Sequence, residues 1–203
     1  FEQSLTLATM LGERRHESVL LLNLGLIANR QGDYTAARQA LDQSLSLTRL
    51  IGDRQNESIS LLNLSSVAGH QGDYIAALMY AQQALAITQM IGDPDMEAWA
   101  RLGEGHAHLG LAQFAAAAVA YQAAINIRLT LNQPHMLIEP RAGLARVALA
   151  QQELALALTH VESILAHVAR HTVDGADEPL LVYWTCYQTL QVHADLRAPA
   201  LLQ

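Results

Sequence analysis

A forty-residue repeat runs through the chain and constrains its fold more than any other feature. Residues 11–50 align without a gap with residues 51–90, and about 18 of the 40 aligned positions are identical. Later stretches diverge but keep this register, as the residues at one equivalent position show: Tyr34, Tyr74, Phe114 and Leu154. Self-similarity at this period is typical of helical arrays in which each unit packs only against its neighbours.

The two ends of the chain fall inside repeats. The opening FEQSLTLATM matches residues 41–50, the second half of a unit, and the last unit is incomplete. Arrays normally end in polar capping repeats, and neither end has one. We therefore expect a fragment of a larger protein whose uncapped ends could support homo-oligomer formation. The predicted organisation is a single array over 1–203: the end of a truncated repeat (1–10), four repeats (11–50, 51–90, 91–130 and 131–170) and a partial repeat (171–203).

Each unit is predicted to form two helices. In the first unit apolar residues recur at helical spacing. In the turn Gln31-Gly32-Asp33 that follows, the glycine can adopt the left-handed conformation that ends a helix, and the aspartate can cap the next helix. Ile51-Gly52-Asp53 repeats this chemistry at the end of the second helix. Pro94 and Pro134 suit first-turn positions, whereas Pro140 should kink the next helix or delay its start. Small residues recur where two helices should cross closely: Ala37, Ala77, Ala117 and Ala157. The expected fold is an all-α, right-handed superhelical solenoid of antiparallel helix pairs.

Composition and the absence of known motifs exclude several classes of function. The chain is 51% hydrophobic and 15% charged, as globular domains are, and it has neither a membrane-length apolar run nor a signal peptide. All 12 of its Lys and Arg residues are arginines, which excludes lysine-dependent phosphate loops and Schiff bases. The net charge of −7 argues against direct nucleic-acid binding. No catalytic sequence motif is present, so we expect that the protein is not an enzyme and has no cofactor. We also expect it to be cytoplasmic and not associated with a membrane.

The repeats resemble the tetratricopeptide family. The matching positions in the first unit are Leu21, Leu24, Gly25, Ala28, Gly32, Tyr34, Ala37, Leu41 and Ser44. The second unit keeps the pattern but has Ser65 and Ala81 in place of Gly25 and Leu41. Units of 40 residues, longer than the usual 34, resemble the long-helix subclass in the C-terminal arrays of bacterial signal-transduction ATPases and transcriptional regulators.

The resemblance implies that the first helix of each unit lines a concave groove that binds a protein or peptide partner. Carried over position by position, the expected groove residues are Val19, Leu22, Asn23, Leu26, Asn29, Arg30, Ile59, Leu62, Asn63, Ser66, His70, Trp99, Leu102, His106, Glu139 and Arg146. Leu22 and Leu62 stand where a carboxylate clamp would need lysine, so capture of a free C-terminal carboxylate is not expected.

Several of these residues allow two interpretations. Asn23 and Asn63 are equivalent, and their amides could bind a peptide backbone or align neighbouring helices. Trp99 could anchor a ligand or pack in the core. His160, His167 and His171 share one face of a predicted helix, but no Cys, Asp or Glu completes a ligand set, so no metal site is predicted. Cys186 is expected to be a small buried residue.

These observations predict a non-enzymatic scaffold for protein or peptide binding, as the interaction or sensor module of a larger bacterial regulatory protein. Two alternatives remain open. The array could sense a small-molecule inducer and control an attached nucleotide-switch ATPase, or it could be a self-association module.

Overall fold

The chain forms two compact helical units. A computed structural model describes residues 6, 8, 10–169 and 176–199, and within these ranges it contains helices and turns but no strand. The first unit is Phe1–Leu111 and the second is Ala112–Gln203. Their boundary falls inside the third predicted repeat, between its two helices. The division of the whole chain into successive repeats of a single array remains a prediction.

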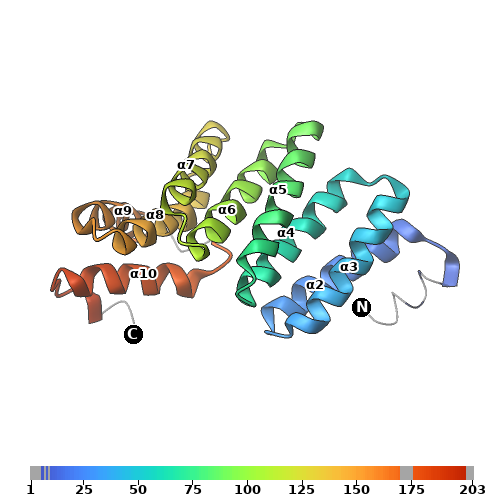
Figure 1. The fold of residues 1–203 in the computed structure, drawn as a ribbon, viewed down its shortest axis with the longest axis horizontal. Coiled ribbons are helices and arrows are strands. Elements are labelled where there is room, and N and C mark those ends of the chain that lie inside the picture. Colours follow the sequence, from blue (N-terminus) through green and yellow to red (C-terminus); the bar gives the residue numbers. More distant parts are fainter. Residues whose placement is uncertain (1–5, 7, 9, 170–175, 200–203) are drawn as a thin grey trace. The chain divides into compact units, whose positions relative to one another are not determined.

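The first unit is a series of long helices joined by short turns (Figure 1). They are α2 (Arg14–Arg30), α3 (Tyr34–Ile51), α4 (Arg54–His70), α5 (Tyr74–Ile91) and α6 (Pro94–Gly110). Each of the helices α2 to α5 packs against the helix that follows it, and α4 also contacts both α2 and α6. The first helices of three successive repeats therefore lie side by side.

Gly-Asp pairs form the turns of this unit, as predicted. Gly32 and Gly52 have φ values of +79° and +74°, a left-handed conformation that costs glycine little. The following residue caps the next helix: the Asp33 carboxylate accepts a hydrogen bond from the Ala36 backbone N–H at 3.0 Å. A glycine with positive φ followed by an aspartate that caps the next helix also occurs at residues 72–73 and 92–93. These turns fix where each helix begins and ends.

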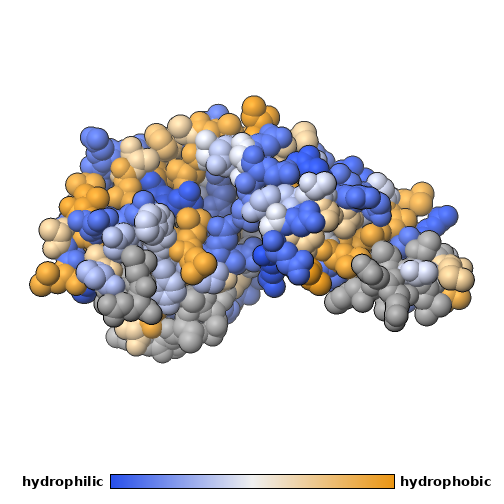
Figure 2. Space-filling view, turned by 90° about the horizontal axis from the view of Figure 1, so that it is seen from below, coloured by the Kyte–Doolittle hydropathy of each residue, from blue (hydrophilic) through white to orange (hydrophobic). Residues whose placement is uncertain are grey.

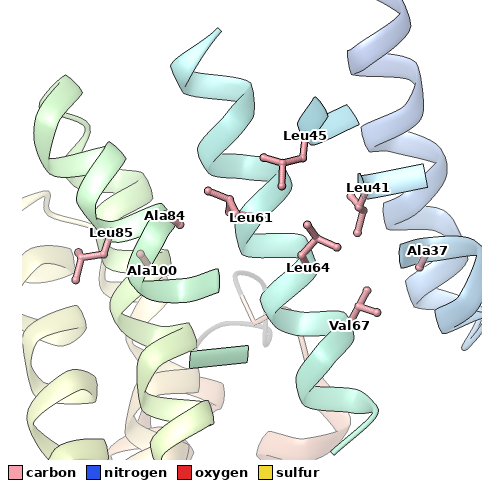
Figure 3. Packing of buried hydrophobic residues seen from close by; sticks show 9 residues of the cluster. All are labelled: Ala37, Leu41, Leu45, Leu61, Leu64, Val67, Ala84, Leu85 and Ala100. Carbon is pink, nitrogen blue, oxygen red and sulfur yellow. The ribbon is translucent and has the colours of Figure 1, made fainter. Parts of the chain in front are cut away.

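A hydrophobic core continues through four consecutive helices of the first unit (Figure 3). Its residues come from α3 to α6: Ala37, Leu41, Leu45, Leu61, Leu64, Val67, Ala84, Leu85 and Ala100. Close approach requires small residues at particular places. A Cβ atom added to Gly25 would lie 2.5 Å from Cγ of Leu41, so α2 and α3 could not keep their spacing. Ala37 is fully buried, as the predicted close crossing requires.

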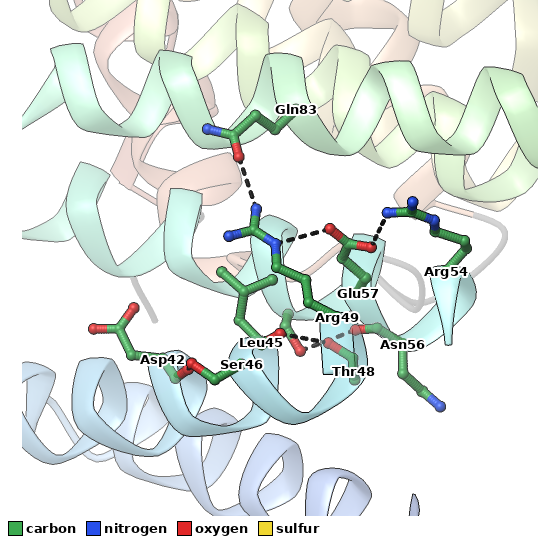
Figure 4. A network of polar contacts seen from close by, with 10 residues as sticks. Asp42, Leu45, Ser46, Thr48, Arg49, Arg54, Asn56, Glu57 and Gln83 are labelled. Atoms are coloured by element: carbon green, nitrogen blue, oxygen red, sulfur yellow. Dashed lines mark hydrogen bonds and ion pairs between the residues drawn. The ribbon is translucent and has the colours of Figure 1, made fainter. Parts of the chain in front are cut away.

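A buried carboxylate joins three helices of this unit (Figure 4). Glu57 of α4 is 3% exposed and receives hydrogen bonds from Arg49 Nε of α3 at 2.9 Å and Arg54 Nη1 of α4 at 2.6 Å. Arg49 also donates to the side-chain oxygen of Gln83 on α5 at 3.1 Å. The network thus satisfies a charge that would otherwise be costly to bury.

The second unit uses a different turn chemistry. Its elements are α7 (Phe114–Thr130), a 3₁₀ helix η1 (Pro134–Leu137), α8 (Ile138–Ala150), α9 (Leu154–Val168) and α10 (Pro179–Val192). Residues other than glycine occupy its left-handed turn positions: Ala112, Asn132, Gln152 and Ala194. Pro140 lies in the first turn of α8, which begins only after η1, so the predicted delay of this helix is confirmed.

The core of the second unit joins α8, α9 and α10 and includes Val161, Ile164 and Cys186. Cys186 is 1% exposed and burial raises the pKa of its thiol to about 12, which confirms its expected role as a small buried residue. The fully buried Tyr121 of α7 lies directly against Gly143 of α8. The all-α prediction of antiparallel helix pairs is confirmed in both units. Among the described helices, none is long and apolar enough to cross a membrane.

Candidate functional site

The predicted groove residues fall into two groups. All except Glu139 and Arg146 lie on α2, α4 and α6, the three neighbouring first helices of the first unit. We call this group the first-helix face; its members are Val19, Leu22, Asn23, Leu26, Asn29, Arg30, Ile59, Leu62, Asn63, Ser66, His70, Trp99, Leu102 and His106. Glu139 and Arg146 lie on α8 of the second unit, so the first-helix face is considered without them.

The apolar residues of the first-helix face form a partly covered layer. Leu22 and Leu102 are only 8% and 7% exposed, so they offer little surface to a partner. Val19 is 37% exposed, and the residues equivalent to it in the next two repeats, Ile59 and Trp99, are half-buried. A row of accessible apolar side chains one repeat apart is suited to contact with the side chains of a polypeptide.

The equivalent residues Asn23 and Asn63 have different environments. The Asn63 amide donates a hydrogen bond to the Ile59 carbonyl of its own helix at 2.9 Å. Asn23 is half-buried, and its side chain makes no hydrogen bond to any described residue. A half-buried amide gains from a partner, and a peptide backbone offers both a donor and an acceptor. Asn23 is therefore the stronger recognition candidate of the two.

Asn29 joins two neighbouring repeats. Its amide nitrogen donates to Ser66 Oγ at 3.2 Å, and its amide oxygen lies 3.1 Å from His70 Nδ1. Because an amide oxygen only accepts, His70 carries a proton on Nδ1 in this arrangement. The His70 ring also lies 5.4 Å from the ring of Tyr34. Asn29 thus fixes the position of two other residues of the first-helix face, and its 8% exposure leaves little surface for a ligand.

The ionisable side chains of the first-helix face are all basic. Its ionisable members are Arg30, His70 and His106, and it contains no carboxylate. The acidic residues next to it on α6 are paired: Arg101 lies 3.0 Å from Glu104 and 3.8 Å from Glu97. The face therefore suits a partner that is apolar and neutral or acidic, not a basic one.

The two predicted residues of the second unit are placed differently from each other. Glu139 is 5% exposed, and its carboxylate accepts a hydrogen bond from the Asp177 backbone N–H at 2.9 Å, joining α8 to the segment that precedes α10. Arg146 is half-buried. A buried carboxylate that holds a neighbouring segment is a structural element of the second unit, whatever further role it has.

Of the three histidines predicted to share one helix face, His160 and His167 lie on α9. His171 lies outside the described residues. Burial and the nearby Arg141 lower the pKa of His160, which keeps this imidazole neutral. Within the described ranges, no group of three or more His, Cys, Asp or Glu side chains is arranged to hold a metal ion.

The contact of Tyr34 with His70 was not predicted from the sequence. The residue equivalent to Asn29 in the second repeat is Gly69, so the amide that holds His70 does not recur. A comparison of the repeat sequences could therefore not predict this network, because it depends on the packing of α2 against α4.

Comparisons with known proteins agree with this architecture. A family model described as tetratricopeptide repeat matches residues 17–90 and 56–130. The crystal structure of BtubC (BKLC) from P. vanneervenii is similar to the chain with a TM-score of 0.73 and 15% sequence identity, over 98% of this chain and 87% of that one. At this identity the similarity concerns the fold alone. A comparison with curated protein sequences gave no significant match.

Proposed function

Because the chain belongs to the tetratricopeptide repeat family, we propose that it is a scaffold that binds a protein or peptide partner on its first-helix face. Repeats of this family support a role in protein interaction. The observation that carries the specific site is the side-by-side arrangement of α2, α4 and α6, which aligns accessible apolar residues at one-repeat intervals next to the amide of Asn23.

In this proposal apolar contacts supply most of the binding free energy and polar groups set the orientation. Val19, Ile59 and Trp99 would contact alternate side chains of an extended or helical segment. Asn23 would hydrogen-bond the partner's backbone, and Arg30 would favour an acidic group nearby. The chain would serve as the interaction module of a larger bacterial regulatory protein, a context supported by its 40-residue units with Ile-Gly-Asp linkers.

A peptide selection tests the proposal. Peptides selected against the 203-residue chain from a random phage-displayed library should bind wild type and raise its melting temperature. Asn23→Ala and Trp99→Ala should each weaken binding of the selected peptide about 5- to 30-fold, since each removes about 1–2 kcal/mol of contact. Circular dichroism should show unchanged helicity.

Asn63→Ala is the matched control, because this residue has the same repeat position but its amide donates within its own helix. It should weaken peptide binding less than Asn23→Ala does. Equal affinity of wild type and both test variants would place binding elsewhere. If metabolites raise the melting temperature and no peptide does, the sensing of a small molecule becomes the better account.

A further inference from the structure

Exposed apolar residues recur at the turns between repeats of the first unit. Because successive helices of this unit run antiparallel, the turn before α2 and the turns after α3 and α5 lie at one edge, and the turns within repeats lie at the other (Figure 1). Each of these three turns follows two large apolar residues, and we call the six together the apolar edge: Met10, Leu11, Leu50, Ile51, Met90 and Ile91. Each of them is between 36% and 79% exposed.

The apolar edge is a recurring feature and not a set of isolated side chains. Single exposed apolar residues are common on protein surfaces, and Figure 2 shows such residues interspersed with hydrophilic ones. Leu50 at the end of α3 is 64% exposed, and so is Met90, its equivalent one repeat later at the end of α5. Both helices pack against the helix before them and the helix after them. These side chains are therefore exposed with their neighbouring helices in place.

The exposed charge beside the first two turns is basic. The side chains of Asp53 and Glu57 are only 8% and 4% exposed. Arg15 Nε donates to Asp53 at 3.2 Å. Arg49 Nε and Arg54 Nη1 donate to Glu57 at 2.9 and 2.6 Å. The side chains of these three arginines are 76%, 49% and 53% exposed, so the guanidinium groups face the solvent and the carboxylates lie beneath them.

This edge can accept further negative charge at one end. A guanidinium has five N–H donors, and three of these groups share two carboxylates. Arg14 is a fourth exposed arginine, at the start of α2. Of the carboxylates at residues 10–17, 49–57 and 89–97, only that of Glu13 is exposed, and it lies 3.1 Å from the ring of His16. At the third turn, Asp93 and Asp95 are half-buried. A matching partner is thus acidic where it meets α2 and α4 and not where it meets α6.

The spacing of the apolar edge matches a helix that lies across it. Helix α4 contacts both α2 and α6, and the axes of packed helices are about 8–10 Å apart. The apolar pairs that precede these three helices therefore recur at about this interval. An α-helix rises about 1.5 Å per residue, so residues seven apart on one side of it are separated by about 10.5 Å. Side chains on one face of an extended strand recur every ~7 Å instead, which does not match.

We propose that the apolar edge binds an amphipathic helix of a protein partner, whose apolar residues follow a heptad pattern and whose carboxylates lie at the end that meets α2 and α4. Apolar contacts with Leu50 and Met90 supply binding free energy. Arg14, Arg15 and Arg54 orient the helix by attracting its acidic end. The apolar edge shares no residue with the first-helix face, so it is a second interaction surface of the first unit.

Two designed peptides test the proposal against the 203-residue chain. Both have three heptads with leucine at the apolar positions. The flanking positions of the first two heptads are glutamate in one peptide and lysine in the other, and those of the third are glutamine in both. Fluorescence anisotropy follows each labelled peptide at a concentration at which it is monomeric. The glutamate peptide should bind with a micromolar dissociation constant, since one helix covers a small interface, and the lysine peptide at least about 10-fold more weakly.

Leu50→Glu and Met90→Glu should each raise the dissociation constant of the glutamate peptide at least about 10-fold, because each removes an apolar contact and repels the acidic helix. Circular dichroism should show unchanged helicity, since both side chains are exposed. Ile75→Glu is the matched control: it introduces the same charge at a 73% exposed residue of α5, at the opposite end of this helix from Met90. It should change the dissociation constant less than about 2-fold.

The absence of glutamate-peptide binding at about 200 µM protein would overturn the proposal, because even weak transient interfaces are detected there. Equal affinity for the lysine peptide, insensitivity to Leu50→Glu, or an equal loss with Ile75→Glu would also overturn it. Vesicles of phosphatidylcholine and phosphatidylserine form the last arm. If they bind wild type but not Leu50→Glu, and the glutamate peptide does not bind, the apolar edge is a lipid-binding surface instead. Trp99→Ala should leave binding of the glutamate peptide unchanged, so this proposal and that for the first-helix face are tested separately.

Discussion

Single residues set how closely neighbouring helices approach, and Gly143 is the clearest case. A Cβ atom at this position would lie 2.4 Å from Cζ of Tyr121, a ring with no room to move because it is fully buried. We expect Gly143→Ala to lower the free energy of unfolding by about 1–3 kcal/mol through overpacking, although alanine is the better helix former. Gly103→Ala is the control: its nearest neighbours would be 3.5 Å away, so chemical denaturation should show unchanged or slightly higher stability. Equal effects of the two changes would contradict this account.

Another residue-level expectation concerns the turn at Gln152, which has a φ of +62°. Glycine occupies the equivalent left-handed positions of the first unit, where no Cβ penalty arises. Gln152→Gly should therefore raise the free energy of unfolding by about 0.5–1 kcal/mol. Gln151→Gly is the contrast, because Gln151 has a φ of −89° and gains nothing from glycine. A melting curve in which Gln151→Gly stabilises as much as Gln152→Gly would refute the expectation.

Residue-level prediction from the sequence succeeded where a residue acts locally. The N-caps at Asp33 and Asp53 could be predicted because, in each case, a glycine that can end one helix directly precedes the aspartate that caps the next. The Asn29 network could not, because its partners lie 37 and 41 residues away and the asparagine does not recur in the next repeat. Of the two equivalent asparagines, only the contacts in the folded chain distinguish Asn23 from Asn63.

At the level of elements, an ion-pair cluster fastens the segment after α10 to α9. Arg197 Nη1 donates to Glu162 of α9 at 3.1 Å, and its Nε donates to Asp195 at 3.0 Å. Hydrogen bonds from Arg197 lower the pKa of Glu162, and they lower the pKa of Asp195 to about 2. Both carboxyls bind protons more readily in the unfolded chain, where ordinary pKa values are 4.5 and 3.8. Their contribution is thus fully present above about pH 5 and is lost as pH falls towards 2.

We therefore expect a pH-dependent effect of Arg197→Gln on this segment. At pH 7 the change should lower the hydrogen-exchange protection of the Ala198 amide, which donates to the Asp195 carbonyl at 3.1 Å. At pH 2 the difference between variant and wild type should be smaller, because a pKa of about 2 leaves Asp195 about half protonated there and its ion pair with Arg197 is weakened. Arg14→Gln, at an exposed position of α2, is the control and should leave Ala198 protection unchanged at either pH. An effect of Arg197→Gln of the same size at both pH values would exclude the ion pairs as its cause.

At the level of elements the sequence predicted most of what the structure contains. The forty-residue period located nearly every helix, because the later repeats keep the register of the first two even where residues other than glycine replace the Gly-Asp turn. The 47% exposure of Trp184 on α10 depends on tertiary packing, which a repeat pattern does not specify.

For the whole molecule, the two compact units imply that stability is a local property in an array of this kind. Glu57 is the best probe, because its 3% exposed carboxylate joins α3 and α4 through Arg49 and, by way of Arg49, reaches α5. Glu57→Gln keeps the shape of the side chain but removes its charge, so two arginines lose their partner. Both arginines are about half exposed, which moderates the loss, and we expect about 1–3 kcal/mol.

Hydrogen exchange followed along the chain should localise that loss. Opening free energies should fall for amides of α3, α4 and α5, while those of α9 and α10 keep their wild-type values, because repeats interact through nearest neighbours. Asp42→Asn is the control: this carboxylate on α3 is exposed, so the same charge change should alter no helix measurably. If Glu57→Gln instead lowers protection equally in all helices, the chain unfolds as one cooperative body, and a ligand on the first-helix face would then stabilise α10 as strongly as α4.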